Sequence, residues 1–120
     1  MNATCPFCDL IARGGEIVAS NARAVAFRDA YPVAEGHTLV VPRRHEAEFF
    51  RCSEDEQAAA WCLVAEVQRA LGPSADGFTV GLNVGESAGQ TVPHAHVHVI
   101  PRRRGDVPDP RGGVRWVLPL

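Results

Sequence analysis

Residues 94–100 read HAHVHVI, and Pro101 follows them directly. Histidine alternates with small or β-branched apolar residues, which together with the closing proline is typical of a β-strand. In a strand, side chains two positions apart project from the same face, so we expect His94, His96 and His98 to form a row. An apolar sheet face gains nothing from three adjacent groups that titrate near neutrality. The row therefore predicts a functional site.

The rest of the chain predicts four further strands and two helices. Runs of β-type residues, each ended by a turn residue or a proline, cover residues 16–20, 24–28, 36–42 and 78–84. We expect the last of these to pair with 94–100 as a hairpin. Residues 6–13 predict a short helix that ends at Gly14 and Gly15. Because the strands are not each followed by a helix, the expected class is α+β, a compact single domain over 1–120 with a mainly antiparallel sheet.

The long predicted helix covers residues 53–72, which read SEDEQAAAWCLVAEVQRALG. Ser53 and Glu56 have the spacing of a capping box, in which each side chain bonds to the backbone of the other residue. The Gly-Pro pair at 72–73 ends the helix. Five apolar residues fall on one stripe at helical spacing, namely Ala60, Leu63, Val64, Val67 and Leu71. We also assign Cys62 to the helix core.

The composition is that of a globular protein with one core. The chain has 120 residues, 46 % of them apolar and 22 % charged, and a formal net charge of −2. It has no run of about 18 apolar residues that would span a membrane, and its net charge does not favour nucleic acid as a partner. Every basic residue is arginine, which excludes lysine-based covalent chemistry. Residues 1–16 lack the pattern of a secretory signal, so we expect a cytoplasmic protein.

Two chemistries fit the row of histidines. Imidazoles can hold a zinc or copper ion, or one of them can act as a nucleophile or an acid–base catalyst. The preceding loop, GESAGQT at 85–91, combines two glycines with two hydroxyl groups and an amide. Such a composition suits a plain hairpin turn, and it also lets backbone N–H groups approach an anion. Beside three histidines, the loop favours a phosphate ligand.

Four cysteines occur, at positions 5, 8, 52 and 62. In a cytoplasmic protein, metal ligands and free thiols are more common than a disulfide framework. Cys5 and Cys8 belong to a CPFC segment whose spacing suits zinc, and a redox pair or two buried thiols are the alternatives. A closed structural zinc site needs two more ligands. Cys52 has no matching partner, and we assign it no role.

Several segments together are similar to the histidine triad superfamily of nucleotide hydrolases and transferases. They are HAHVHVI at 94–100, GHTLVVPRRH at 36–45, AFRDAYP at 26–32 and AGQTV at 88–92. The resemblance covers residues 5–101, and the tail at 102–120 is similar to the tails of some bacterial members. It implies a purine nucleotide substrate and a homodimer whose sheets join.

The resemblance also implies roles for individual residues. His96 corresponds to the nucleophile that attacks the α-phosphorus to form a nucleotidyl-histidine intermediate. His98 and His37 correspond to histidines that contact phosphate oxygens, and Asp29 to the residue that holds the ribose hydroxyls. Other matched positions bind phosphate (Asn83, Gly89, Gln90, Thr91) or clamp the base (Phe7, Leu10, Phe27). Core positions for Phe27 and Leu10, and a turn position for Asp29, are the alternatives.

One structural zinc per chain is implied by the same resemblance. Members that carry CxxC recruit a histidine at the end of the PRRH-like segment and the first histidine of the row. These positions correspond to His45 and His94, which would complete a set with Cys5 and Cys8. A place for His94 in the catalytic hydrogen-bond chain is the alternative.

The expected activity is cleavage at the α-phosphate, with release of AMP from dinucleoside polyphosphates. An adenosine phosphoramidate or an aminoacyl-adenylate is the alternative substrate. Two other functions compete with this one: a nucleotide-binding module without catalysis, and a metalloenzyme that holds a catalytic metal on the row. Retention of His96 argues against the first, and loss of activity in a chelator would favour the second.

Overall fold

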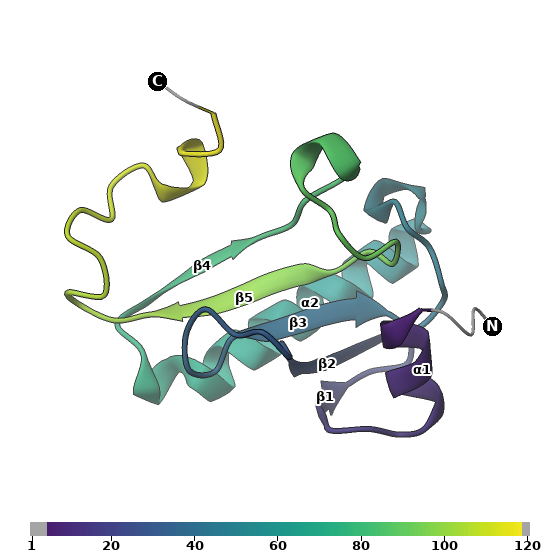
Figure 1. The fold of residues 1–120 in the computed structure, drawn as a ribbon. Coiled ribbons are helices and arrows are strands. Elements are labelled where there is room, and N and C mark those ends of the chain that lie inside the picture. The colour runs from purple at the N-terminus through teal and green to yellow at the C-terminus, as the bar shows by residue number, and fades with distance from the viewer. Residues whose placement is uncertain (1–4, 119–120) are drawn as a thin grey trace.

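Five strands form one sheet in the computed structural model, which describes residues 5–118 (Figure 1). Along the chain, the elements are α1 (Pro6–Ala12), β1 (Ile17–Ser20), β2 (Ala24–Arg28), β3 (Thr38–Pro42), η1 (Phe49–Arg51), α2 (Glu54–Leu71), η2 (Gly72–Ser74), β4 (Gly77–Gly81), η3 (Glu86–Ala88), β5 (Val97–Arg102) and η4 (Gly113–Arg115). The strand order is β1-β2-β3-β5-β4, and every neighbouring pair is antiparallel. The expected α+β class, with one short and one long helix, is confirmed.

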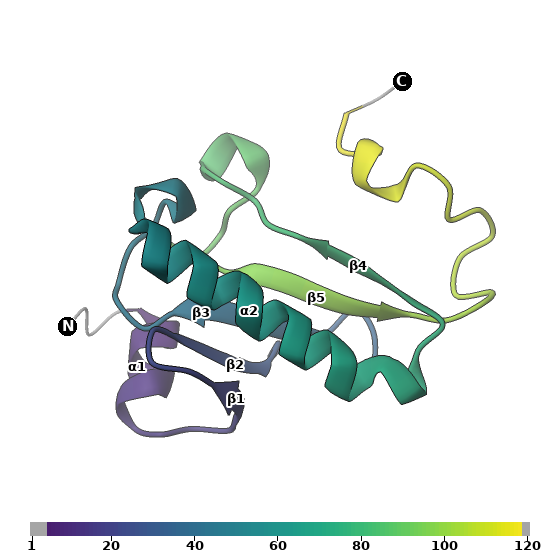
Figure 2. The same ribbon diagram turned by 180° about the vertical axis from the view of Figure 1, so that it is seen from behind.

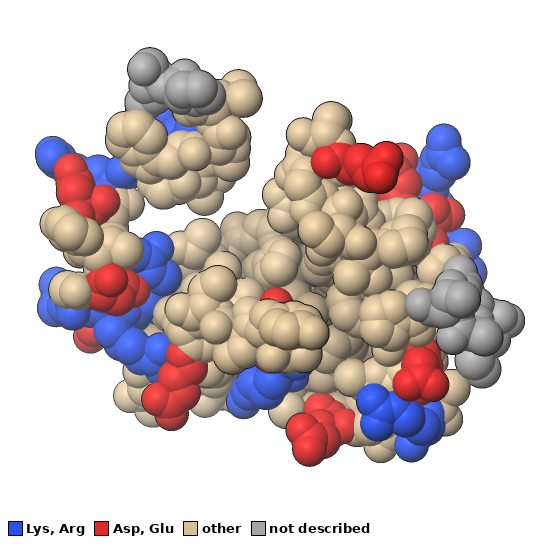
Figure 3. Space-filling view, viewed as in Figure 1, with Lys and Arg blue, Asp and Glu red and all other residues tan. Residues whose placement is uncertain are grey.

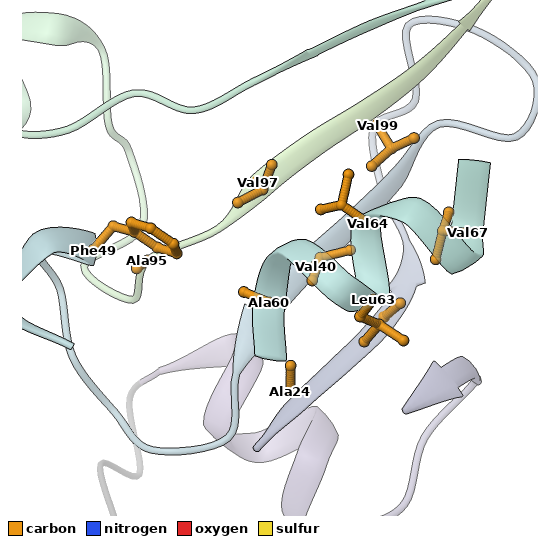
Figure 4. Packing of buried hydrophobic residues seen from close by; sticks show 11 residues of the cluster. Ala24, Val40, Phe49, Ala60, Leu63, Val64, Val67, Ala95, Val97 and Val99 are labelled. Carbon is orange, nitrogen blue, oxygen red and sulfur yellow. The ribbon is translucent and has the colours of Figure 1, made fainter. Parts of the chain in front are cut away.

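Helix α2 covers one face of the sheet and contacts β2, β3 and β5, in front of which it lies in Figure 2. The side chains buried between the two layers come from alternate strand residues and one stripe of the helix, together with Phe49 of η1 and Ala95 just before β5 (Figure 4). They are Ala24, Ala26, Val40, Phe49, Ala60, Leu63, Val64, Val67, Ala95, Val97 and Val99. Burial of apolar surface stabilises this packing by roughly 25 cal/mol per Å².

The opposite face of the sheet carries a second apolar cluster, which lies against α1. The remaining alternate residues of β2 and β3 meet the first residues of the helix there. The cluster consists of Cys5, Phe7, Cys8, Val25, Phe27, Leu39 and Val41. Figure 1 shows that α1 lies over one end of this face only, so on this face most of β5 is not covered by a helix.

Helix α2 begins with the predicted capping box. Ser53 accepts a hydrogen bond from the Glu56 amide at 3.1 Å, and the Glu56 carboxylate accepts one from the Ser53 amide at 2.9 Å. The same carboxylate accepts two bonds from Arg44, at 2.9 and 3.0 Å. These bonds, that of Arg44 most of all, lower the pKa of Glu56 to about 2. Within the described residues, no helix is long and apolar enough to cross a membrane.

The assignment of Cys62 to the helix core is wrong. The buried stripe consists of the predicted Ala60, Leu63, Val64 and Val67, with Leu71 partly buried, whereas Cys62 is exposed. With 3.6 residues per turn, position 62 lies about 150° around the helix from the centre of that stripe. Its exposure therefore follows from the helical periodicity. Cys52 is buried where η1 ends, and burial raises the pKa of its thiol.

Strand β5 begins at Val97, three residues later than the sequence predicts, so His94 and His96 precede it. The reason lies in the backbone, because the Ala95 amide donates to the Glu46 carbonyl at 2.7 Å and not to a neighbouring strand. The inward and outward alternation still holds, since Ala95 packs in the core against α2. The other four predicted strands are confirmed, with ends that shift by up to three residues.

Beyond β5 the chain forms a C-terminal arm, residues 103–118 of the described part, which extends past β4 in Figure 1. Its first turn is closed by Arg102, whose guanidinium donates to Asp106 at 2.7 and 2.9 Å. The apolar residues near the end of the arm are exposed, namely Val114, Trp116, Val117 and Leu118.

Candidate functional site

A cavity of about 500 Å³ opens on the face of the sheet that α1 partly covers. Its volume is in the range of small-molecule sites. Nine residues that the sequence singles out line it: Phe7, Leu10, Phe27, Asp29, Asn83, Gly89, Thr91, His96 and His98. In Figure 3, uncharged side chains surround the hollow near the centre of this face, and most charged side chains lie nearer the rim. His37 and Gln90, also singled out, are not among the lining residues.

The apolar wall of the cavity is built from rings of the second cluster. The ring centroid of Phe7 lies 5.3 Å from that of Phe27 and 5.2 Å from that of His96. Such pairs add about 0.5–1.5 kcal/mol to the burial of their surface. Phe27 is buried in the cluster, as its core assignment predicts, and it also lines the cavity. Leu10 is partly buried against the same cluster.

The backbone sets the tautomer of His96. Its Nδ1 lies 2.8 Å from the carbonyl oxygen of His94. Because a carbonyl can only accept, Nδ1 carries the hydrogen and donates it. In the neutral form of the ring, Nε2 is then the unprotonated nitrogen, and the ring lines the cavity between Phe7 and His98. A neutral imidazole held in this way offers a lone pair for nucleophilic attack.

His98 and His37 form a hydrogen-bonded pair beside it. The Nδ1 of His98 lies 2.9 Å from the Nε2 of His37, and the Asp29 carboxylate lies 3.4 Å from the same Nε2. Burial lowers the pKa of both rings, and the neighbouring His96 and His37 lower that of His98 further. The charge of Asp29 opposes these shifts in part. Both rings are therefore neutral at pH 7.

The three histidines of the row face different partners. His94 contacts the sulfur atoms of the CPFC cysteines, His96 bonds to a backbone carbonyl, and His98 bonds to His37. Among the described residues, no group of side chains that could hold a metal ion contains more than one of these three histidines.

The side chain of Gln90 holds the glycine-rich loop in shape. Its oxygen accepts from the Gly85 amide at 2.9 Å, and its nitrogen donates to the carbonyls of Ala47 and Val92 at 2.7 and 3.0 Å. All of these partners are backbone groups, two of them in the loop or directly after it. The polar atoms of Gln90 are thus occupied by the protein itself.

Asn83, Gly89 and Thr91 are the residues of this region that line the cavity. The Asn83 amide donates to the Ala88 carbonyl at 2.6 Å, which joins the two sides of the loop. Gly89 has a φ of 92°, a conformation that glycine adopts without strain. Its amide donates to the Glu86 carbonyl within the loop, so the side chains of Asn83 and Thr91 are the loop's polar side chains on the cavity.

A separate group of four side chains lies beside the cavity: Cys5, Cys8, His45 and His94. One ligand atom from each lies within 4.8 Å of all the others, and three of the four residues are buried. They come from the start of α1, from the segment after β3 and from the residues before β5. The structure thus brings together the complete set that the resemblance implies.

This group fits a zinc ion. In a tetrahedral site with usual bond lengths, a sulfur ligand and a nitrogen ligand lie about 3.6 Å apart. The sulfur-to-Nδ1 distances here are 3.5 Å for Cys5 to His94, 3.5 Å for Cys8 to His94 and 3.2 Å for Cys8 to His45. His94 donates its Nε2 hydrogen to the Pro42 carbonyl at 2.8 Å, which leaves Nδ1 unprotonated toward the sulfurs. Burial also lowers the pKa of His94, which keeps the ring neutral as a ligand must be.

Seven further residues line the cavity that the sequence does not single out, and three of them have polar side chains: Arg13, Arg28 and Tyr31. Arg28 donates to the Thr38 hydroxyl at 2.5 Å, and the Tyr31 amide donates to the Asp29 carboxylate at 2.9 Å. Arg28 and Tyr31 flank Asp29 in the AFRDAYP segment, and that proximity is the signal that could have pointed to them. Arg13 carried no such signal.

Comparison with known proteins gives a family match over most of the chain. The sequence matches the HIT domain family over residues 14–105. An uncharacterized HIT-like protein of Saccharolobus solfataricus is 43 % identical over 101 residues, covering 81 % of this chain and 73 % of that protein. An adenosine 5'-monophosphoramidase of Schizosaccharomyces pombe is 36 % identical over 103 residues, covering 82 % and 74 %. An asymmetrical bis(5'-nucleosyl)-tetraphosphatase of the same yeast is 34 % identical over 95 residues, covering 78 % and 52 %.

A similar solved structure is a zinc-bound histidine triad family protein from Mycobacterium smegmatis. It has a TM-score of 0.78 and 30 % identity, and the alignment covers 95 % of this chain and 90 % of that one. The fold, the sequence match and the relatives agree. The chain belongs to the HIT domain family.

Proposed function

We propose that the protein is a nucleotide hydrolase or transferase that cleaves at the α-phosphate through a nucleotidyl-histidine intermediate on His96. The observation that carries this proposal is the hydrogen bond from His96 Nδ1 to the His94 carbonyl, which leaves Nε2 as the nucleophilic nitrogen. The names of two relatives, a monophosphoramidase and a tetraphosphatase, support nucleotide cleavage.

The proposed reaction proceeds by two displacements at phosphorus. The lone pair of His96 Nε2 forms a bond to the α-phosphorus while the bond to the leaving group breaks, and the leaving group keeps that electron pair. Water then attacks the same phosphorus, the P–N bond breaks, and the water proton passes to solvent. The His94 carbonyl accepts Nδ1–H throughout, so it stabilises the positive charge that develops on the ring.

The nucleoside half of the substrate lies in the apolar part of the cavity. Phe7, Leu10 and Phe27 contact the base, because they form the apolar wall of the cavity. Asp29 accepts hydrogen bonds from the ribose hydroxyls. One of its oxygens already accepts from the Tyr31 amide, which fixes the orientation of the carboxylate.

The α-phosphate lies between the histidines and the loop. His98 donates to a phosphate oxygen, and His37 supports His98 from behind. Asn83 and Thr91 contact the phosphate from the loop, and the Gly89 backbone lies beside them. Gln90 contributes by keeping the loop in shape.

We further propose that Cys5, Cys8, His45 and His94 bind one structural zinc ion. Four protein ligands close such a site and leave no open position for substrate, so the metal stabilises the fold and takes no part in the reaction. The zinc-bound structural neighbour supports this assignment.

Dinucleoside polyphosphates are the proposed substrate class, with AMP as the common product. The AGQTV segment at 88–92 supports this choice, since it resembles the polyphosphate-hydrolysing members of the superfamily. An adenosine phosphoramidate is the second candidate. The observation that favours it is the 36 % identity with the yeast monophosphoramidase.

We also propose a homodimer. Strand β4 is an edge strand whose five residues are all partly exposed, so its backbone can pair with a second chain. Light scattering coupled to size exclusion should give twice the mass of one chain, and a monomer at micromolar concentration would contradict this proposal.

Hydrolysis in labelled water tests the proposed reaction. Diadenosine polyphosphates and adenosine phosphoramidate should each release AMP that carries one ¹⁸O atom on its phosphate, because attack occurs at the α-phosphorus. Label found only in the departing fragment overturns α-attack. A hundredfold preference for the phosphoramidate makes it the substrate class.

Two variants of His96 test the nucleophile. His96→Ala and His96→Asn should both lose turnover while they bind AMP nearly as the parent does, and the Asn side chain retains an N–H donor in the pocket. Unchanged circular dichroism and zinc content serve as the controls for folding. Substantial turnover by either variant overturns the covalent mechanism, and binding without turnover by the parent makes the protein a non-catalytic module.

A further inference from the structure

We propose that the backbone amide of Val33 is a positioning group for catalysis, because it decides, through His37, which nitrogen of His98 carries the hydrogen that faces the phosphate. This inference rests on the proposed function for its catalytic meaning. The tautomers themselves can be measured without any substrate.

The hydrogen-bond chain begins at a group whose direction is fixed. The Val33 amide lies 3.1 Å from Nδ1 of His37. A backbone N–H can only donate, so Nδ1 must accept, and neutral His37 carries its hydrogen on Nε2. A second proton on this ring would point an N–H at the N–H of Val33. The amide therefore also disfavours the imidazolium form, and burial of the ring acts in the same direction.

The second link carries the assignment to His98. The Nε2–H of His37 has two acceptors within reach, the Nδ1 of His98 at 2.9 Å and the Asp29 carboxylate at 3.4 Å. The shorter contact is to His98. A hydrogen on its Nδ1 would place two N–H groups face to face at that distance, so neutral His98 must carry its hydrogen on Nε2. His37 is only 3 % exposed, and water is therefore excluded as an alternative partner.

The Nε2–H of His98 is the donor that the α-phosphate needs. A hydrogen bond to a phosphoryl oxygen strengthens as negative charge grows there in the transition state. The other tautomer would present a lone pair to the same oxygen and repel it. The side chain of Val33 takes no part, since it is 73 % exposed. Position 33 should thus tolerate any residue except proline, which has no N–H.

Nuclear magnetic resonance of the zinc-loaded protein with ¹⁵N-labelled histidine tests the assignment directly. Protonated and unprotonated ring nitrogens resonate in well-separated ranges. At pH 7 we expect hydrogen on Nε2 of both His37 and His98, and Val33→Ala should leave this pattern unchanged. Val33→Pro removes the amide hydrogen and should move the hydrogen of His98 to Nδ1 in a large share of the molecules. Turnover of that variant should fall by about 100-fold, as on loss of one transition-state donor, with a much smaller change in KM.

Several results would overturn the proposal. One is a hydrogen on Nδ1 of His98 in the unaltered protein, and this spectrum decides alone if Val33→Pro does not fold. Another is a folded Val33→Pro that keeps both tautomers and full turnover. If the expected tautomers are found in a protein that cleaves no nucleotide, the proposed function fails and the catalytic meaning of the amide fails with it, while the hydrogen-bond chain stands.

Discussion

At the scale of single residues, backbone groups hold the imidazoles. The Val33 amide donates to His37, while the carbonyls of Pro42 and His94 accept from His94 and His96. Amides and carbonyls cannot exchange donor and acceptor character, so each contact fixes one tautomer. Side-chain partners such as serine or glutamine would leave the choice open. The chemistry of the site therefore depends on backbone positions as much as on the five histidines.

The charge of Asp29 should set the acid limit of activity. Asp29 raises the pKa of His37 and His98, opposing their burial. Asp29→Asn removes that charge, so both pKa values should fall further. Once His98 is protonated, its Nδ1 can no longer accept the hydrogen bond from His37. With a lower pKa, this protonation occurs at a lower pH. The acid limb of kcat should thus move to lower pH, whereas Asp109→Asn, on the exposed arm, should leave it in place. A shift to higher pH contradicts this account.

Gln90 should matter for the shape of the loop. Gln90→Ala removes three hydrogen bonds to backbone groups. Because these bonds are only part-buried, their loss should cost about 1 kcal/mol. Urea denaturation should show a drop of that order, and KM for the nucleotide should rise. Ser87→Ala, an exposed change in the same loop, should alter neither quantity. Equal stability of the two variants would show that the contacts contribute nothing.

At the scale of elements, α2 depends on its first turn. Glu56 has a pKa of about 2 in the folded protein, against an ordinary value of 4.5. A lowered pKa means that the contribution is complete above about pH 4.5 and is lost as the pH falls through about 2. Glu56→Gln should lower the free energy of unfolding by about 1 kcal/mol at pH 7.

The difference between Glu56→Gln and the parent should shrink as the pH approaches 2 and vanish below it, because the parent carboxylate is then protonated. Glu54→Gln changes an exposed acid in the same turn that makes no capping contact, and it serves as the control. Chemical denaturation at several pH values measures both. A gap that stays constant from pH 7 to pH 2 would mean that the ionised carboxylate is not the source of the stability.

The elements also show what local sequence can predict. The limits of α2 are visible because the capping box and the Gly-Pro pair act within a few residues. The start of β5 cannot be predicted in this way, because it depends on the hydrogen bond from the Ala95 amide to the Glu46 carbonyl, and Glu46 is far away in the sequence. The hydrogen bond from the Gln90 side chain to the Ala47 carbonyl could not be predicted for the same reason, since Ala47 lies 43 positions away in the sequence. The exposure of Cys62, by contrast, follows from periodicity and could have been predicted.

Some residues of the candidate site could likewise be predicted from the sequence, and others could not. Alternation alone indicates that His96 and His98 share a side with the cavity, and the resemblance supplies the metal set. Neither source indicates the Val33 amide, because a backbone donor leaves no trace in residue types. Neither source indicates the cavity residue Arg13 either, since exposed arginines are common on any surface.

At the scale of the whole molecule, the four-ligand group joins three segments that lie far apart in the sequence. It ties α1 to the segment after β3 and to the residues before β5. About one zinc per chain should copurify with the parent, and Cys8→Ser should lose the metal and lower the Tm by several degrees, since binding energy of this kind is folding energy. Cys62→Ser changes an exposed cysteine and should keep both properties. Unchanged zinc content in Cys8→Ser would disprove the ligand set.

The strand order also has a consequence for synthesis of the chain. Strand β5 lies between β3 and β4, although it is made after both. The N-terminal hairpins can form while translation continues, but a gap remains in the sheet until residues 97–102 emerge. Cys5 must likewise wait for His94, 89 positions later. A nascent chain stalled before that point has neither the complete cavity nor the complete group of Cys5, Cys8, His45 and His94, so both form only after residues 94–102 have been made.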